Sequence, residues 1–448
     1  MSSFFSRIFR LRAGEAGLVV ALGFMLLANS LALEVSGVVA VSGFLDQVSV
    51  NNIILVWAVD MILIAIATGL QSLVIDRFER SNILKAMLFG FALIYSLLRL
   101  MFTLNVPAWL NYSLLFVISD LQWLFFPLIF YILINDVFDM AQSKRLIPVI
   151  AAWGFLGQIL GFGLAAIAPD ILAAVNAHSA ELLTLNVFIY LVCYGVANYA
   201  LAKIKVRQTT PKAESIRETL GEGWGFVKEV VSFRYLMIAL LCGYMVLTIL
   251  DFHFLSIAHT SFDSTASFQT FYSLYGLSVT VAGFIIQGLL SSRILEKLQV
   301  KNSFLVMPIA LVIGSGAALG FPGLLAGTAA IFAGRLTQET INLSAEKAFQ
   351  ALVPEERRGR VVLFMSSYLF SGGTLLGCIA LGIVVFGGLQ LFGPAELPVS
   401  LIIAVVGAVV AIWAVFRMRA AYDSSMLNWR LKRRQRGSSV LDGIEFES

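Results

Sequence analysis

The stretch KIKVRQTTPKAESIRETLGEGWGFVKEVVSFR, residues 203–234, is the longest polar segment inside the chain. On either side of it the sequence consists of apolar runs of about 20 residues, a length that can cross a hydrocarbon core of about 30 Å. Six runs precede the segment and six follow it. Their predicted limits are 16–43, 53–75, 82–104, 110–134, 148–168 and 183–202 before it, and 236–258, 268–291, 303–321, 324–345, 362–388 and 399–417 after it.

The composition indicates a membrane protein. Of the 448 residues, 59% are hydrophobic and 13% are charged, and the mean hydropathy is +0.88, whereas soluble proteins carry about 25% charged residues. We therefore predict an all-α membrane protein with about 12 transmembrane helices in two six-helix bundles. The predicted parts are an N-terminal bundle (1–202), a cytosolic linker with a surface helix (203–235), a C-terminal bundle (236–417) and a cytosolic tail (418–448).

The placement of basic residues predicts the orientation. Of the 31 Lys and Arg residues, all but Arg99 and Arg335 fall in the segments that lie on one side if twelve spans alternate. Cytosolic loops carry this excess of positive charge, so we expect both termini in the cytosol and a multi-pass protein of the plasma (inner) membrane. The first run is too long for a signal-peptide core and is predicted to be a retained span.

Enzymatic function has no support in the sequence. The cysteines Cys193, Cys242 and Cys378 lie in apolar runs, and no Ser/His/Asp, metal or phosphate-loop pattern is present. We expect no catalytic residue, no metal site and no cofactor. The expected partners are the lipid bilayer, a small solute of unknown identity and, for coupling, protons. We expect no nucleic-acid partner, and we expect a monomer.

Charged residues inside the predicted spans are the main functional candidates, because a charge at the centre of a bilayer costs about 2.5–3.5 kcal/mol even on the lower experimental scale. Acids outnumber bases. The acids are Glu34, Asp60, Asp120, Asp251 and Glu339, the bases are Arg99 and Arg335, and His253 can also titrate. Asp60 and Arg99 lie in adjacent spans, and we predict that they form a structural ion pair.

The remaining charged residues are predicted to line a substrate or proton pathway. Glu34 and Asp120 then have no assigned partner, and a buried lone carboxyl group favours its protonated form, so both are candidate proton carriers. Glu34 and Asp251 lie at similar depths in the first and seventh spans. His253 is either a proton relay or an interface histidine.

Span ten carries a polar stripe. The residues Arg335, Glu339, Asn342 and Glu346 share one helical face, which either lines the pathway or supports packing.

Two glycine patterns predict close helix contacts. Gly154, Gly157 and Gly161 in span five, like Gly372, Gly373 and Gly377 in span eleven, allow a neighbouring backbone to approach closely. These surfaces serve either sliding or static packing.

The loop SLVIDRFER, residues 72–80, resembles the signature loop of the major facilitator superfamily, with Ser72 and Glu79 at positions that are usually Gly. The resemblance implies two parallel six-helix repeats with a substrate site near the membrane midplane. Side chains in such a loop can latch neighbouring helix ends. The predicted cytosolic gate comprises Asp76, Arg77, Arg80, Asp136, Lys144 and Arg145.

Three further segments resemble the nucleotide translocase (ATP/ADP antiporter) branch of that superfamily and its bacterial relatives: NDVFD at 135–139, LDFHF at 250–254, and QAL at 350–352 followed by RRGR at 357–360. The chain departs from that branch where phosphate binding requires cations. The first span lacks Lys and Arg, and Leu255 stands where the pattern has Lys. The sequence therefore favours a proton-coupled secondary transporter that works by alternating access. A nucleotide exchanger, and a non-transporting membrane scaffold or sensor, remain alternatives.

Overall fold

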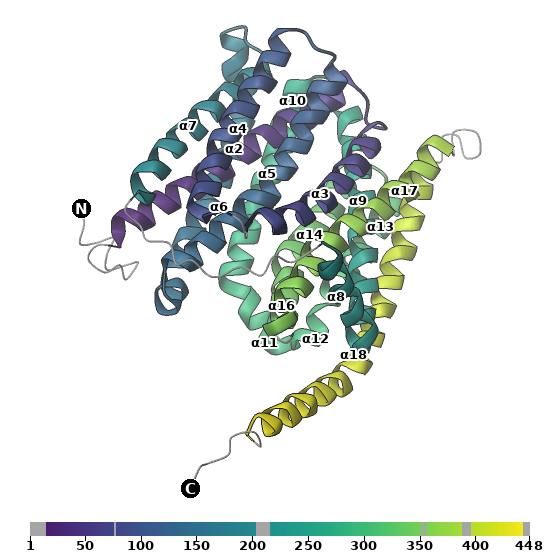
Figure 1. Ribbon diagram of the computed structural model, residues 1–448. Helices are drawn as coiled ribbons and strands as arrows, with labels where there is room; N and C mark the ends of the chain where they lie inside the picture. The colour runs from purple at the N-terminus through teal and green to yellow at the C-terminus, as the bar shows by residue number, and fades with distance from the viewer. Residues whose placement is uncertain are drawn as a thin grey trace. The chain divides into compact units, whose positions relative to one another are not determined.

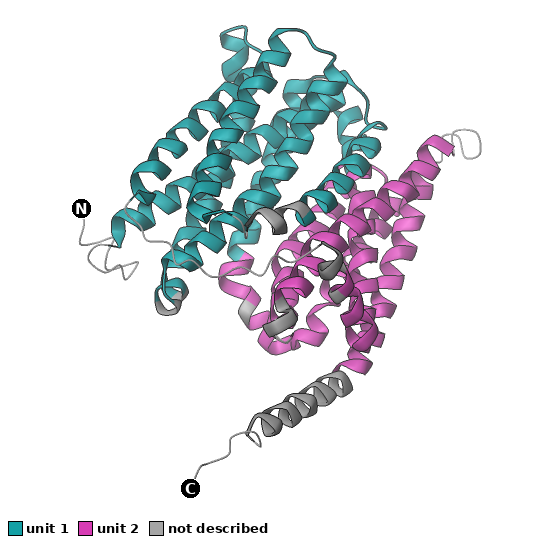
Figure 2. Ribbon diagram, viewed as in Figure 1, with its two compact units in different colours: residues 1–216, 254–285 teal, residues 217–253, 286–448 magenta. Residues whose placement is uncertain are grey.

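The computed structural model describes residues 15–75, 78–202, 216–350, 353, 355–387 and 396–441, and every regular element among them is a helix (Figure 1). The chain forms two compact units (Figure 2). Unit 1 contains Met1–Ile216 and Phe254–Ile285, and unit 2 contains Arg217–His253 and Ile286–Ser448. The division falls inside one helix, α9 (Val231–Ser261). Residues 254–285 therefore join unit 1, although the sequence-based division assigns them to the C-terminal bundle.

Unit 1 contains the helices of the first half of the chain, the end of α9, and α10. Its helices are α2 (Ala16–Gln47), α3 (Ile53–Ile75), α4 (Arg80–Thr103), α5 (Ala108–Val137), α6 (Met140–Ala174), the short η1 (Ser179–Glu181), α7 (Leu182–Leu201) and α10 (Thr265–Ile285).

The described part of unit 2 contains four π-helical turns. Its elements are α8 (Ile216–Glu229), the first part of α9, η2 (Ile286–Leu290), α11 (Ser291–Leu298), α12 (Val300–Ser303), α13 (Val306–Gly320), α14 (Leu324–Thr337), η3 (Gln338–Asn342), α15 (Leu343–Gln350), α16 (Glu355–Leu363), η4 (Phe364–Leu369), α17 (Phe370–Gly382), η5 (Ile383–Gly387) and α18 (Glu396–Leu441). The segments η2, η3, η4 and η5 are π-helical, a conformation that is common at functional sites.

The membrane architecture is confirmed in its main feature. Among the described residues, ten helices are long and apolar enough to span a bilayer. Of the twelve predicted spans, the second is present as the shorter apolar helix Ile53–Gly69. The tenth, predicted at 324–345, is not among the ten, because Arg335, Gln338 and Glu339 lower its hydropathy.

The predicted linker and tail are only partly described. Residues 203–215 lie outside the described part, and α8 follows them. The aromatic side chains Trp224 and Phe226 of α8 differ in their surroundings. Phe226 is buried and packs edge-on against Phe233, whereas Trp224 is half exposed. In the tail, α18 continues beyond the candidate span Leu397–Tyr422, and residues 442–448 lie outside the described part.

Helix α2 is the centre of unit 1, where it packs against α5, α6 and α7. The core around it contains large side chains that are wholly buried, including Leu22, Phe126, Phe130 and Tyr190. A bilayer provides no hydrophobic driving force between helices, so close van der Waals packing stabilises such a bundle.

Both units contain a glycine-lined helix contact, as the sequence predicts. A Cβ atom at Gly157 of α6 would lie 2.2 Å from the Leu27 carbonyl oxygen of α2. In unit 2, a Cβ atom at Gly373 of α17 would lie 2.8 Å from the Leu241 carbonyl oxygen of α9. Because both distances are shorter than a carbon atom allows, only glycine fits at these positions. A glycine contact of this kind joins the first predicted span to the fifth, and another joins the seventh to the eleventh.

The α2–α6 contact can be tested with the substitution Gly157→Ala. The added methyl group must push the two helices apart, and overpacking of this kind costs about 1–3 kcal/mol. We expect a lower thermal unfolding midpoint for the purified protein in detergent.

Gly163→Ala on the same helix is the matched control, because a Cβ atom at Gly163 meets nothing within 4 Å. Alanine favours a helix by about 1 kcal/mol over glycine, so this variant should match or exceed the parent. Equal midpoints for the two variants would contradict the close contact.

Candidate functional site

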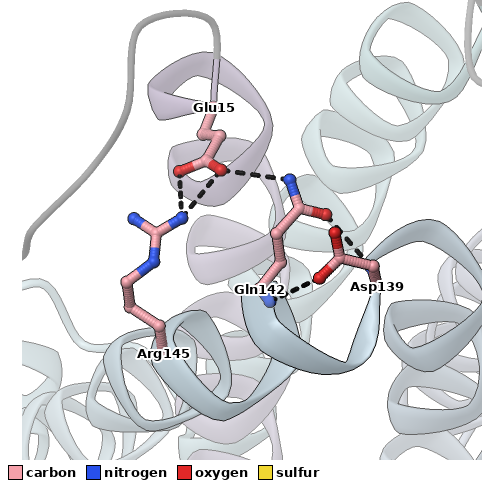
Figure 3. Close-up of polar contacts among 4 residues, drawn as sticks. All are labelled: Glu15, Asp139, Gln142 and Arg145. Carbon is pink, nitrogen blue, oxygen red and sulfur yellow. Dashed lines mark hydrogen bonds and ion pairs between the residues drawn. The ribbon is translucent and has the colours of Figure 1, made fainter.

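The polar residues at the start of α6 form a network in unit 1 (Figure 3). Asp139 caps α6: its carboxylate accepts a hydrogen bond from the Gln142 backbone amide at 2.7 Å, and the Gln142 side chain accepts one from the Asp139 amide at 3.1 Å. This capping box satisfies two backbone donors that the helix leaves free. Gln142 Nε2 also donates to Glu15 Oε1 at 3.1 Å.

Glu15 joins the start of α2 to the start of α6. Arg145 Nη2 donates to both Glu15 carboxylate oxygens at 2.8 Å (Figure 3), and both side chains are largely buried. Arg145 is a predicted gate residue, whereas Glu15 was missed. Glu15 comes just before the first predicted span, on the same predicted side of the membrane as Arg145, and this position could have identified it.

A second ion pair brings two predicted gate residues together. Arg80, the first residue of α4, binds Asp136 near the end of α5. The remaining predicted gate residues cannot be placed: Asp76 and Arg77 lie outside the described residues, as does the side chain of Lys144.

The predicted Asp60–Arg99 pair is absent, and both residues have other neighbours. Arg99 binds the Glu181 carboxylate in η1 and donates to Thr103 Oγ1 at 2.7 Å. Asp60 is fully buried and interacts electrostatically with Asp120 of α5, and neither of its carboxylate oxygens has a hydrogen-bonding partner among the described residues. The reason is the packing of the helices, because α3 packs on α5, whereas α4 packs on α5 and α7. Estimated depth could not reveal which faces meet.

Glu34, the predicted proton carrier of the first span, contacts α6. Gln158 Nε2 donates to Glu34 Oε1 at 3.2 Å. A Cβ atom at Gly161 would lie 2.9 Å from Glu34 Cβ, so the glycine surface of α6 leaves the room that Glu34 occupies. Glu34 therefore has a hydrogen-bonding partner on a neighbouring helix.

A neutral polar network in the core of unit 1 was not predicted. The Tyr95 hydroxyl group contacts Gln122 Oε1 at 2.5 Å and Ser36 Oγ at 2.9 Å. Asn29 Oδ1 accepts from Tyr190 at 2.9 Å and from Gln122 Nε2 at 3.2 Å. All five side chains are buried, and satisfied buried networks fix one arrangement of the helices. The candidate residues predicted in the first six spans are all charged, so the sequence analysis missed this network.

Unit 2 contains an accessible charged cluster. Arg335 Nη2 of α14 donates to Asp251 Oδ2 of α9 at 2.5 Å, with 37% and 20% of the two side chains exposed. Glu339 in η3 is also exposed and interacts electrostatically with both. Two acids and one base give the cluster a formal charge of −1. The structure thus assembles three predicted pathway residues, with Arg335 bound to Asp251 on another helix.

The predicted polar stripe of span ten divides at the π-helical turn η3. Asn342 and Glu346 are buried, and Asn342 Nδ2 donates to Glu346 Oε1 at 2.5 Å, while the Tyr244 hydroxyl group lies 3.5 Å from the same oxygen. Arg335 and Glu339 remain accessible. A π-helical turn changes the angular spacing of the side chains, which α-helical periodicity does not anticipate.

His253 is isolated in unit 2. Its side chain is 2% exposed, and neither ring nitrogen has a hydrogen-bonding partner among the described residues. Both interpretations of His253, as a proton relay or as an interface histidine, stay predictions.

A shallow pocket of about 110 Å³ lies where α2 ends and α10 begins in unit 1. Asp46 Oδ1 accepts a hydrogen bond from Thr265 Oγ1 at 2.5 Å beside it. The lining residues are Ser42, Asp46, His259, Phe262, Asp263, Ser264, Thr265 and Phe268. Within the described part of the chain, no three His, Cys, Asp or Glu side chains are arranged to hold a metal ion.

No protein-family model matches the sequence, and the comparison with curated proteins gives no match. Solved structures match over almost the whole chain. A mutant of the nucleoside transporter NupG is 15% identical with a TM-score of 0.67, covering 90% of this chain and 99% of that chain. An autoinhibited POT family peptide transporter is 10% identical with a TM-score of 0.66, covering 91% and 96%.

A bacterial homologue of the iron transporter ferroportin is 15% identical with a TM-score of 0.62, covering 90% of this chain and 100% of that chain. The chain has the fold of major facilitator superfamily transporters. At these identities the likeness shows the fold alone. The matched structures are transporters, not enzymes, and they indicate no narrower branch of the superfamily.

The corrected ion pairs can be tested with a double-mutant cycle in unit 1. Arg99→Gln and Glu181→Gln remove the two ends of a half-exposed pair, so we expect a coupling energy of about 0.2–1 kcal/mol. Asp60→Asn and Arg99→Gln should be additive, since the two side chains have different partners. Unfolding of the purified single and double variants measures both energies. A coupling energy between Asp60 and Arg99, with none between Arg99 and Glu181, would contradict the structure and support the ion pair predicted from the sequence.

Proposed function

We propose that this protein is a secondary active transporter, which moves a small solute across the membrane by alternating access and uses protons as the coupling ion. The observation that carries the proposal is the accessible cluster of Asp251, Arg335 and Glu339 in a fold whose solved examples are transporters. Charged side chains within apolar helices are tolerated when they face water or one another. Transporters of this fold bind their solute near the membrane midplane.

We further propose the complete twelve-span arrangement, with two six-helix bundles at 1–202 and 236–417. The short apolar helix Ile53–Gly69 would be the second span, and residues 324–350 the tenth. Charged residues lower the hydropathy of a span, and such residues are tolerated where the span lines a pathway rather than facing lipid. The basic loops support cytosolic termini and an inner-membrane location.

The substrate class follows from charge. NupG is named a nucleoside transporter, the POT family protein a peptide transporter, and the third protein a homologue of the iron transporter ferroportin, so the fold does not select a substrate. The cluster in unit 2 has a formal charge of −1, which favours a cationic or zwitterionic solute over a polyanion. A nucleotide exchanger is the second candidate, and it rests on the resemblance of residues 135–139 and 250–254 to that branch.

Transport can be tested in proteoliposomes with an imposed pH gradient. A thermal-shift screen of polyamines, amino acids, nucleosides and nucleotides would first identify a solute, since a ligand at 100 times its Kd stabilises by about 2.7 kcal/mol. We expect Asp251→Asn and Arg335→Gln to lower uptake of that solute by about tenfold or more, because a hydrogen bond to a charged group contributes about 1.5–3 kcal/mol.

Arg99→Gln is the control, because it removes a positive charge, as Arg335→Gln does. The partner of Arg99 is Glu181 in η1, which is not part of the cluster of Asp251, Arg335 and Glu339. It should transport normally at equal protein amounts. If every class of solute fails both to stabilise and to be taken up by folded protein, the scaffold or sensor alternative holds.

The proposed orientation can be tested by cysteine labelling in sealed, right-side-out cells. Single cysteines at Asn105, Ala177 and Glu396 should react from outside, whereas those at Thr209 and Ser438 should react only after permeabilisation. The native Cys193, Cys242 and Cys378 should first be replaced by serine or alanine. Labelling of Thr209 in intact cells would contradict the orientation.

A further inference from the structure

Helix α18 of unit 2 carries an exposed apolar stripe along its candidate span, Leu397–Tyr422. The side chains of the stripe are spaced three or four residues apart, so they share one face of the helix. Each of them is between 50% and 57% exposed. A continuous apolar surface of this kind marks a place where a membrane or another molecule binds. The members of the stripe are Ile402, Val406, Val409, Trp413 and Phe416.

The stripe ends at an arginine that contacts two aromatic rings. The guanidinium carbon of Arg417 lies 5.8 Å from the centroid of the Tyr235 ring of α9 and 6.0 Å from that of the Trp413 ring. The two rings meet edge to face, with their centroids 5.8 Å apart and an interplanar angle of 85°. Both distances from Arg417 are within the range of a cation–π interaction. The two rings therefore hold the guanidinium group at the end of the stripe.

The hydrogen-bond donors of Arg417 have no acceptor among the described residues. The Arg417 side chain is exposed, and its contacts within the described part of the chain are those with the two rings. Arg234, next to Tyr235, differs, because its Nη2 donates to the Lys228 carbonyl oxygen at 2.9 Å. A guanidinium group presents five donors in a planar fork that matches the oxygens of a phosphate group. Contacts with rings leave these donors available for an anion.

The position of Arg417 in the sequence favours an amphiphilic anion. Tyr and Trp are enriched where the hydrocarbon core of a bilayer meets water, and anionic lipids attract basic residues there. A phospholipid can place an acyl chain along the stripe and its phosphate group at Arg417, whereas a free phosphate ion would leave the stripe uncovered. A second copy of the same helix face would bring another arginine, since residues 397–422 contain no Asp or Glu.

We propose that Arg417, Tyr235 and Trp413 bind the headgroup of an anionic phospholipid whose acyl chain lies along the exposed stripe of α18. The guanidinium group donates hydrogen bonds to the phosphate oxygens, and the two rings fix its orientation. The bound lipid holds this end of α18 at the membrane surface. The site lies within unit 2, and the inference depends neither on the solute nor on the coupling ion of the proposed transport.

Native mass spectrometry of the purified full chain in detergent tests lipid binding without any transport. We expect the parent to bind one molecule of phosphatidylglycerol more tightly than phosphatidylcholine with the same acyl chains. Arg417→Gln should weaken this binding about tenfold or more, the effect of losing a hydrogen bond between charged groups. Arg417→Lys should restore only part of the affinity, because an ammonium group lacks the planar fork. Trp413→Leu should also weaken binding, although it leaves the charge unchanged.

Arg293→Gln is the matched control, because Arg293 is an exposed arginine of α11 on the same predicted side of the membrane. It should retain the affinity of the parent. Equal weakening in Arg293→Gln and Arg417→Gln would overturn the proposal, since binding would then depend on net charge alone. Equal affinity of the parent for the two lipids would overturn it as well. Thermal unfolding without added lipid verifies that each variant is folded, and Arg417→Lys and Trp413→Leu keep the test valid if Arg417→Gln is not.

Two further outcomes would assign the site to a different ligand. Inorganic phosphate and glycerol phosphate in excess should not displace phosphatidylglycerol, because neither has an acyl chain. Displacement by either would overturn the proposal in favour of a free phosphate compound. A lipid-free dimer of the parent that Trp413→Leu dissociates would overturn it in favour of a second copy of the chain.

Discussion

The hydrocarbon core of a bilayer offers no hydrogen bonds, and this constraint determines most of what is seen in the two units. Backbone groups must be satisfied within each segment, so every described regular element is a helix. Polar side chains must find partners on neighbouring helices, as Tyr95, Gln122 and Asn29 do in the core of unit 1. Helices must approach closely, since dispersion replaces the hydrophobic effect between them, and glycines such as Gly157 and Gly373 permit this.

The same constraint makes the charged residues informative. Most charged pairs of unit 1 lie near the ends of helices, where Glu15 meets Arg145 and Arg80 meets Asp136. These contacts fasten the starts of α2, α4 and α6 to neighbouring elements. Within the apolar part, by contrast, Asp60 interacts electrostatically with another acid.

The acids of the two units lie in different surroundings. In unit 2 the cluster of Asp251, Arg335 and Glu339 is accessible and contains its own base. In unit 1, Asp60 is fully buried, and neither of its carboxylate oxygens has a hydrogen-bonding partner among the described residues. A π-helical turn next to Arg335 separates the accessible residues of span ten from the buried Glu346.

The sequence by itself determined the all-helical membrane class, because hydropathy depends on composition and run length alone. It also indicated the glycine contacts, and it singled out Arg80, Asp136 and Arg145, which form ion pairs in unit 1. The tertiary structure decided which charges meet. Asp60 and Arg99 have similar estimated depths in the membrane, but depth does not specify the direction in which a side chain points from its helix. In the structure Arg99 forms an ion pair with Glu181, and Asp60 interacts electrostatically with Asp120. The neutral network around Tyr95 and the π-helical turn at Gln338–Asn342 likewise arise from contacts between helices, which no single segment encodes.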